Sequence, residues 1–155
     1  MVTGLLLGFS KIVSRHMSST QSSDTINRKR TRPKSVPVPN EGEDGLFSES
    51  WFPVCLSKEL GVGRVIGRPF LDGRIVIFRS NGGVAQVLSA YCPHMGADLA
   101  AGKVIDDHIQ CGFHRWEFNA DGWCDKTGLG DTPPKEACLY KFHTVEKFGF
   151  VWAFN

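Results

Sequence analysis

The sequence predicts an all-β, antiparallel domain, and three observations favour this class. Short apolar stretches are separated by glycine-rich turns such as Asp72-Gly73 and Asn81-Gly82-Gly83. No stretch keeps a helical period over three turns. Near the end of the chain, aromatic side chains stand at every second position, as expected of a strand: Phe148, Phe150, Trp152 and Phe154.

The strands can be placed in chain order. Four are expected at residues 51–56, 64–70, 74–79 and 84–88, because each stretch is short, apolar and bounded by turn residues. Residues 116–118 and 123–124 should pair across the turn at residues 119–122. Residues 139–144 and 148–154 should then close the domain as a hairpin around Glu146-Lys147. We expect the alternating aromatic side chains of the last strand to fill one buried face of the sheet.

Charge divides the 155-residue chain into a tail and linker, residues 1–47, and a domain, residues 48–155. Residues 1–35 hold seven Lys and Arg against one Asp, a net charge of +6. Because the whole chain is +2, residues 36–155 carry −4. The basic charge therefore belongs to the tail, and the domain gives no reason to expect a nucleic-acid partner. About 110 residues are enough for one core.

The N-terminal segment has the composition of a targeting sequence. Residues 1–23 resemble an organelle transit peptide, because they lack acidic residues, contain Lys11 and Arg15, and are rich in Ser and Thr. A dispensable extension fits the same composition. The apolar run is too short to cross a bilayer, so no transmembrane span is expected. Localisation is predicted to be mitochondrial or plastid if this is a transit peptide, and cytoplasmic otherwise.

Two half-sites, each with one Cys and one His, carry the chemistry of the chain. They are Cys92-Pro93-His94 and Cys111-Gly112-Phe113-His114, separated by sixteen residues. Such donors suit a cluster of two unlike irons, with imidazoles on one iron and thiolates on the other. A Cys2His2 zinc site needs the same four donors, although zinc half-sites usually space their ligands by two or more residues. A third alternative is that the four residues never meet.

The sequence around these donors resembles the cluster-binding loops of Rieske-type oxygenases. The matching stretches are C-P-H-M-G-A-D-L, residues 92–99, and C-G-F-H-R-W-E-F, residues 111–118. The resemblance implies a Rieske-like antiparallel β base domain with a small cluster-binding subdomain of two loops. It also implies a [2Fe-2S] cluster, with its imidazoles facing outward toward a partner, on four ligands: Cys92, His94, Cys111 and His114. Gly96 and Gly112 are expected to let backbone N–H groups approach the cluster sulfurs.

Three positions distinguish this chain from high-potential Rieske proteins. Those proteins carry a disulfide between the two loops, where this chain has Ala97 and Phe113, and a Ser two residues after the last ligand, where it has Trp116. We therefore expect a potential near the low end of the Rieske range, about −150 mV. Arg115 stands where the oxygenase loop commonly has Gly; if the backbone there is left-handed, Arg costs about 1 kcal/mol.

The remaining Cys and His residues suggest no second site. Cys55, Cys124 and Cys138 are expected to be buried free thiols. His108 and His143 have no partner spacing typical of the mononuclear iron site at which Rieske oxygenases activate oxygen. We therefore predict no catalytic residue in this chain.

The resemblance implies one-electron transfer through a low-potential cluster. The chain would be the N-terminal, electron-transfer portion of a Rieske-type oxygenase, an oxidoreductase acting on a hydrophobic ring substrate. Its partners would be a reductase or ferredoxin as electron donor and a mononuclear non-haem iron catalytic domain as acceptor. A stand-alone Rieske ferredoxin and a zinc-stabilised interaction module are the two alternatives that the sequence leaves open.

Overall fold

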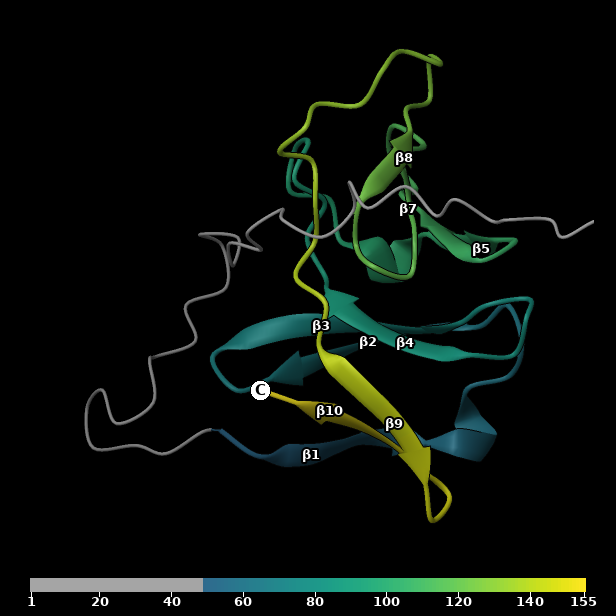
Figure 1. Cartoon of the computed structure of the whole chain (residues 1–155), viewed down its shortest axis with the longest axis vertical. Coiled ribbons are helices and arrows are strands. Elements are labelled where there is room, and N and C mark those ends of the chain that lie inside the picture. The colour runs from purple at the N-terminus through teal and green to yellow at the C-terminus, as the bar shows by residue number, and fades with distance from the viewer. Residues whose placement is uncertain (1–48) are drawn as a thin grey trace, which may run out of the picture.

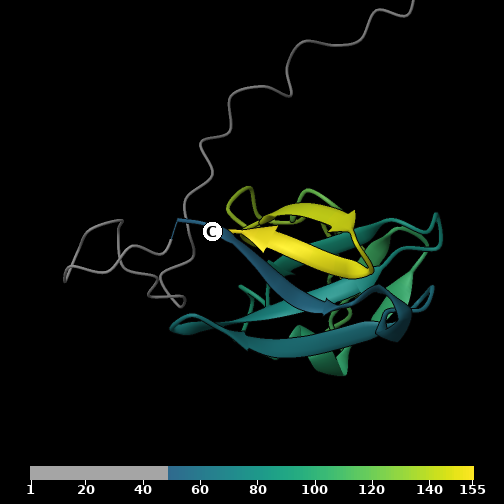
Figure 2. The same cartoon turned by 90° about the horizontal axis from the view of Figure 1, so that it is seen from below.

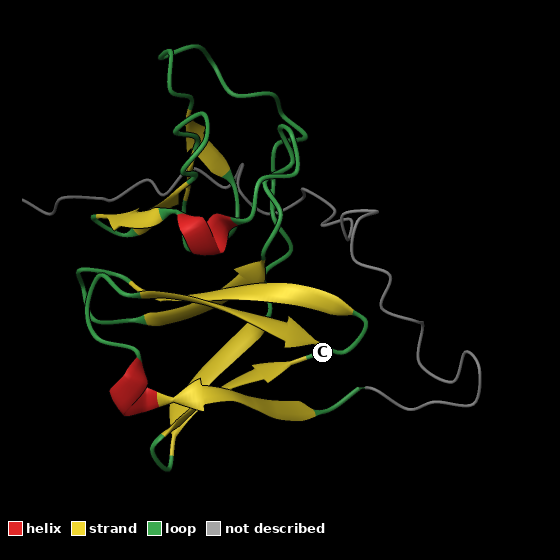
Figure 3. Cartoon of the chain, turned by 180° about the vertical axis from the view of Figure 1, so that it is seen from behind, coloured by secondary structure: helices red, strands yellow, loops and turns green. Residues whose placement is uncertain are grey.

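A computed structural model describes residues 49–155, whose strands form three antiparallel sheets (Figures 1 and 3). The first contains, in spatial order, β1 (Trp51–Leu56), β10 (Phe150–Phe154) and β9 (His143–Lys147). The second contains β2 (Val65–Phe70), β3 (Gly73–Arg79) and β4 (Ala85–Ser89). The third contains β5 (Lys103–Ile105), β6 (His108–Gln110), β7 (Glu117–Phe118) and β8 (Cys124–Lys126). Two short 3-10 helices accompany them in the described part, η3 (Ser57–Glu59) and η4 (Leu99–Ala101). The predicted all-β class is confirmed.

The predicted tail and linker, residues 1–47, lie outside the described residues. The transit-peptide expectation and the domain boundary at residue 48 therefore stay predictions. In the described part of the chain, no helix is both long and apolar enough to cross a membrane.

The middle sheet, β2-β3-β4, is covered on both faces of its central strand β3, which makes the fold three layers deep. Residues 75–78 of β3 are an unbroken apolar run, and each is at most 1% exposed. Ile75 and Ile77 pack toward the sheet β1-β10-β9, whereas Val76 and Phe78 pack toward the sheet β5–β8. Figure 2 shows the first two sheets stacked on each other, and Figure 1 shows the third set apart at one end. The part of the fold formed by the first two sheets, the base domain, and the part formed by β5–β8, the subdomain, thus both pack on strand β3.

The prediction that the aromatic residues of the last strand fill a buried face was wrong. The fully buried residues of β10 are Val151 and Ala153, whereas Phe148 is 80% and Phe150 37% exposed. The inner face of β10 lies against a core already filled by Phe70, Phe142 and the β3 isoleucines, so small side chains fit there. The aromatic rings instead contact one another on the outer face: Trp51 with Phe154 at 5.4 Å and Phe150 with Trp152 at 5.9 Å between centroids.

The closing hairpin turns two residues later than predicted. Its turn is Phe148-Gly149, and both residues have positive φ, 56° and 78°. Two left-handed residues give a turn whose twist matches that of the flanking strands, and glycine adopts this conformation without strain. The first strand of the hairpin is accordingly β9 rather than residues 139–144.

Arg79 joins the two sheets of the base domain. Its Nη1 and Nη2 each donate to the Glu146 carboxylate at 2.8 Å, and its Nε donates to the Leu60 carbonyl at 2.6 Å. The Arg79 guanidinium holds the pKa of Glu146 at about 2. Since Arg79 is on β3 and Glu146 on β9, this ion pair fixes one sheet against the other.

We expect Glu146→Gln to destabilise the protein by about 1 kcal/mol at pH 7, a modest value because Glu146 is a third exposed. A lowered pKa in the folded state stabilises the fold above the ordinary carboxyl value of 4.5. That contribution is lost as the pH falls from 4.5 toward 2. Urea unfolding at pH 7 and pH 3 measures the effect, with exposed Glu136→Gln as control. An equal loss at both pH values would contradict the prediction.

Candidate metal centre

The first ligand loop, residues 91–98, contains Cys92 and His94 and follows strand β4 as a closed turn. A bridge between Tyr91 and Asp98 closes its base. Within it, the N–H of Cys92 donates to the Ala97 carbonyl at 2.9 Å, and the N–H of Gly96 donates to the Cys92 carbonyl at 2.8 Å. Gly96 has φ 73°, so glycine is needed for the turn itself. The N–H of Gly96 itself is used within the loop, and the expectation that the glycines let backbone N–H groups approach the cluster sulfurs stays a prediction.

The second ligand loop, residues 111–116, has the same two backbone hydrogen bonds as the first. The N–H of Cys111 donates to the Trp116 carbonyl at 2.8 Å, and the N–H of Arg115 donates to the Cys111 carbonyl at 3.1 Å. Arg115 therefore occupies the place of Gly96, and its φ of 57° is left-handed. The backbone conformation that would make Arg costly, by about 1 kcal/mol, is present. The two frames match although the spacing from Cys to His differs by one residue.

An ion pair ties the first loop to the middle sheet. Arg74, on β3, donates from Nε to Asp98 Oδ2 at 2.7 Å. The other oxygen of Asp98 accepts the Ala100 N–H at 2.9 Å and so caps η4, which buries Leu99 in the core. Sequence analysis did not single out Asp98 or Arg74. An Asp directly before a short apolar helix is an N-cap signal that would have found the first of them.

Two glycines let the ligand loops approach each other. A Cβ on Gly102 would overlap the carbonyl oxygen of Gln110, and a Cβ on Gly112 would lie 2.8 Å from the Ala101 carbonyl oxygen. Residues 101–102 form the end of η4, and residues 110–112 include the second cysteine. Gly112 is thus explained by close packing, and this packing places the second half-site beside the first.

Both cysteines of the half-sites point into the core. Cys92 is 3% and Cys111 2% exposed, in the same apolar cluster as Val76, Phe78 and Phe118. Burial raises the pKa of the Cys92 thiol far above its usual value, and the neighbouring Cys111 thiol raises it further. A thiol with a pKa raised in this way stays protonated until a cation compensates the thiolate charge, so metal binding at Cys92 would release a proton.

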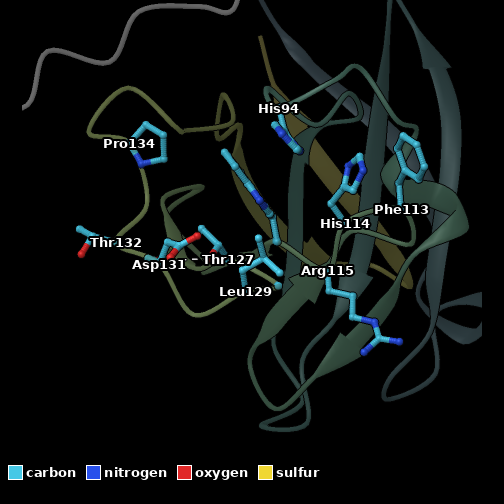
Figure 4. A pocket seen from close by; sticks show the side chains of 11 residues that line it. His94, Phe113, His114, Arg115, Thr127, Leu129, Asp131, Thr132 and Pro134 are labelled. Carbon is cyan, nitrogen blue, oxygen red and sulfur yellow. Dashed lines mark hydrogen bonds between the residues drawn. The ribbon is translucent and has the colours of Figure 1, made fainter.

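The two imidazoles lie together at the outer end of the subdomain (Figure 4). The ring centroids of His94 and His114 are 4.7 Å apart, with 67° between the planes. His94 is exposed and His114 half-buried. Each has an aromatic neighbour: Trp116 stacks on His94 at 4.4 Å and 7°, and Phe113 contacts His114 at 3.8 Å and 37°. Trp116 was considered in the sequence only for the hydroxyl that it lacks, so its contact with His94 was not predicted.

The four donors form two pairs, a buried thiol pair and an outer imidazole pair. Across residues 49–155, no three or more His, Cys, Asp or Glu side chains converge on a position for a single ion. A tetrahedral zinc ion would require all four donors at about 2.0–2.3 Å from one point. One pair of thiols and one pair of imidazoles instead fit a centre with two unlike irons, in which each iron is held by one pair.

A cavity of about 550 Å³ opens beside the imidazoles. One wall is the second ligand loop, and the other is formed by the loop at residues 127–134 (Figure 4). Thr127 Oγ1 donates to the Asp131 carbonyl at 3.1 Å within that loop. A Cβ on Gly128 would overlap the His114 carbonyl oxygen, so this loop packs tightly on the ligand loop at its base.

The remaining Cys and His residues lie apart from these pairs or have other partners. None of the five cysteines is in a disulfide; Cys55 and Cys124 are buried as predicted, and Cys138 is half-buried. His108 Nε2 lies 3.0 Å from the Asp125 carboxylate. His143 is exposed at the start of β9.

Comparison with known proteins places this geometry among Rieske domains. The family described as "Rieske [2Fe-2S] domain" matches residues 50–138. The cholesterol 7-desaturase of Bombyx mori is 36% identical over 70% of this chain and 24% of its own length. The oxygenase component of a Rhodococcus rhodochrous 3-ketosteroid-9-alpha-monooxygenase is 32% identical over 68% of this chain and 29% of its own. The structure of dicamba monooxygenase superposes with a TM-score of 0.64, at 30% identity, over 69% of this chain and 33% of that one. The chain thus spans a quarter to a third of these relatives.

Proposed function

The chain belongs to the Rieske [2Fe-2S] domain family, and we propose that Cys92, His94, Cys111 and His114 hold its [2Fe-2S] cluster. The observation that carries the proposal is the pairing of donors, with two thiols in the apolar core and two imidazoles at the outer end. The cysteines would hold the inner iron and the histidines the outer one. When bound, such a cluster takes up and releases one electron.

The cysteines and the histidines would have different roles in electron transfer. Burial of Cys92 and Cys111 keeps water from the thiolate side of the centre. The exposed His94 ring gives the centre an edge that another protein can approach. Because transfer falls off with distance, this edge is the expected entry and exit for the electron.

The surface around this edge suits docking of a protein partner. Three large apolar side chains are exposed there: Met95 by 67%, Phe113 by 63% and Leu129 by 91%. Phe113 and Leu129 also line the cavity beside the imidazoles. An apolar patch with an adjacent cavity is typical of an interaction site. We propose a reductase or ferredoxin as the donor and a mononuclear non-haem iron catalytic domain as the acceptor.

The relatives support an oxygenase context for this electron transfer. Two are named for cholesterol and for 3-ketosteroids, and the structural neighbour is a monooxygenase. We propose that the chain is the electron-transfer portion of a Rieske-type oxygenase whose substrate is a hydrophobic ring system of the sterol type. The relatives are about three to four times as long as the matched segment, and we propose that the oxygenation itself belongs to a catalytic iron domain.

An EPR-monitored redox titration of anaerobically purified protein tests this function. We expect a Rieske-type signal on reduction, with a midpoint potential of about −150 mV. The reason is that Ala97, Phe113 and Trp116 supply neither the disulfide nor the hydroxyl of high-potential centres. A midpoint well above zero would contradict the low-potential assignment. Protein that contains zinc and lacks sulfide would contradict the redox function altogether.

A further inference from the structure

Trp116 makes a ring contact that links the two ligand loops. Its indole lies parallel to the His94 imidazole, with 4.4 Å between centroids and 7° between planes. Trp116 ends the second loop, whereas His94 belongs to the first. The contact therefore connects one half-site to the other through side chains, in addition to the glycine packing of the backbones.

The indole is itself fixed by the core. Its backbone carbonyl accepts the Cys111 N–H at 2.8 Å, and its side chain packs on the core cluster that contains both cysteines. Phe118, which is fully buried, lies 6.5 Å away between ring centroids. The Trp116 indole thus packs on the core on one side and on the exposed His94 imidazole on the other.

Among the ring contacts of residues 49–155, the second imidazole, His114, is stacked on no ring that the core holds. His114 contacts Phe113, its neighbour in sequence, at 3.8 Å with the planes tilted by 37°. Phe113 is 63% exposed, so its ring is not anchored in the core. The two imidazoles therefore differ: a ring held by the core covers one face of His94, and a surface ring touches His114.

We propose that Trp116 is a positioning residue for His94, an inference that rests on the proposed ligand role of His94. By stacking, the indole holds the imidazole plane in the orientation that metal binding requires, so less rotamer freedom is lost on binding. It also keeps water from one face of the ring. Water stabilises the more highly charged state of a centre, and a cluster with two thiolates gains negative charge on reduction.

The experiment compares the wild type with Trp116→Leu and Trp116→Phe, each purified anaerobically with its cluster. Trp116→Leu keeps an apolar side chain but removes the ring, whereas Trp116→Phe keeps a ring that can stack. Phe113→Leu is the matched control, because it removes the aromatic neighbour of the other imidazole. Three quantities are measured: the EPR g-values of the reduced protein, the midpoint potential, and the rate at which the signal disappears in excess chelator.

We expect Trp116→Leu to shift the g-values, raise the midpoint potential, and lose its cluster about three- to tenfold faster than the wild type. Trp116→Phe should restore most of the wild-type behaviour, and Phe113→Leu should differ little from it. Identical g-values and potentials in Trp116→Leu and the wild type would overturn the inference, even if Trp116→Leu were less stable overall. A wild type without any cluster signal would instead reject the proposed function, so the two failures are distinguishable.

Discussion

Replacing Cys111 with Ser is expected to remove the cluster. Loss of a direct ligand should exceed the roughly 10- to 100-fold loss of affinity that follows from losing a residue that only supports a ligand. Iron and acid-labile sulfide per protein should therefore fall more than tenfold, together with the EPR signal. His114→Ala should have the same effect, because the outer iron would keep a single imidazole.

The chain offers matched controls for both ligand variants. Cys55 is also buried, at 8% exposed against 3% and 2% for the proposed ligands, but it lies in the core between the first two sheets. His108 is in the subdomain but is paired with Asp125. Cys55→Ala and His108→Ala should keep full iron and sulfide content. If Cys111→Ser kept its cluster, or if the Cys55 variant lost it equally, the proposed ligand set would be incorrect.

The base domain was the most predictable part of the structure. The strand at residues 51–56 was predicted at its observed limits, and those at 64–70, 74–79 and 84–88 were within one residue of β2, β3 and β4. Each of these strands is five to seven residues long, so apolar stretches and turn residues suffice to locate it. By contrast, β5 and β6 have three residues each and carry no readable pattern. They pair with each other around the turn Asp106-Asp107, where Asp106 has a φ of 52°.

Periodicity could not decide which face of the last strand is buried. Alternation in residues 148–154 correctly indicated a strand, but it defined two faces, one aromatic and one with Val151 and Ala153. Size of the apolar side chains favoured the aromatic face. The observed choice depends on space left by Phe70 and Phe142, which come from distant parts of the chain. Such information is tertiary and is absent from the local pattern.

The site was predictable in its donors but not in its supports. Cys-x-His and Cys-x-x-His look unlike each other in sequence, so the shared hydrogen-bond frame of the two loops was not visible. Arg115 was noticed because it stands in place of a glycine, and the left-handed backbone that was considered for it is observed, with a φ of 57°. The roles of Asp98, Trp116 and Gly102 depend on contacts with residues of other elements: Arg74, His94 and Gln110.

Gly102→Ala is expected to destabilise the protein by about 1–3 kcal/mol and to lower its cluster content. A Cβ at this position would overlap the carbonyl oxygen of Gln110 and lie 3.0 Å from that of Leu99. Both neighbours are backbone atoms, so neither can turn away as a flexible side chain would. Because Gln110 directly precedes Cys111, relief of the overlap must move the second ligand loop away from the first.

Gly61→Ala provides the control for this second variant, since a Cβ there would have no neighbour within 4 Å. It should change the stability by less than about 1 kcal/mol, and a small gain is expected because Ala restricts the unfolded chain. Urea unfolding and iron analysis of both variants measure the two effects together. If Gly102→Ala matched Gly61→Ala in stability and iron content, close approach of the loop backbones would not be what holds the half-sites together. If stability fell while iron per folded protein stayed constant, the packing would support the fold without positioning the second cysteine.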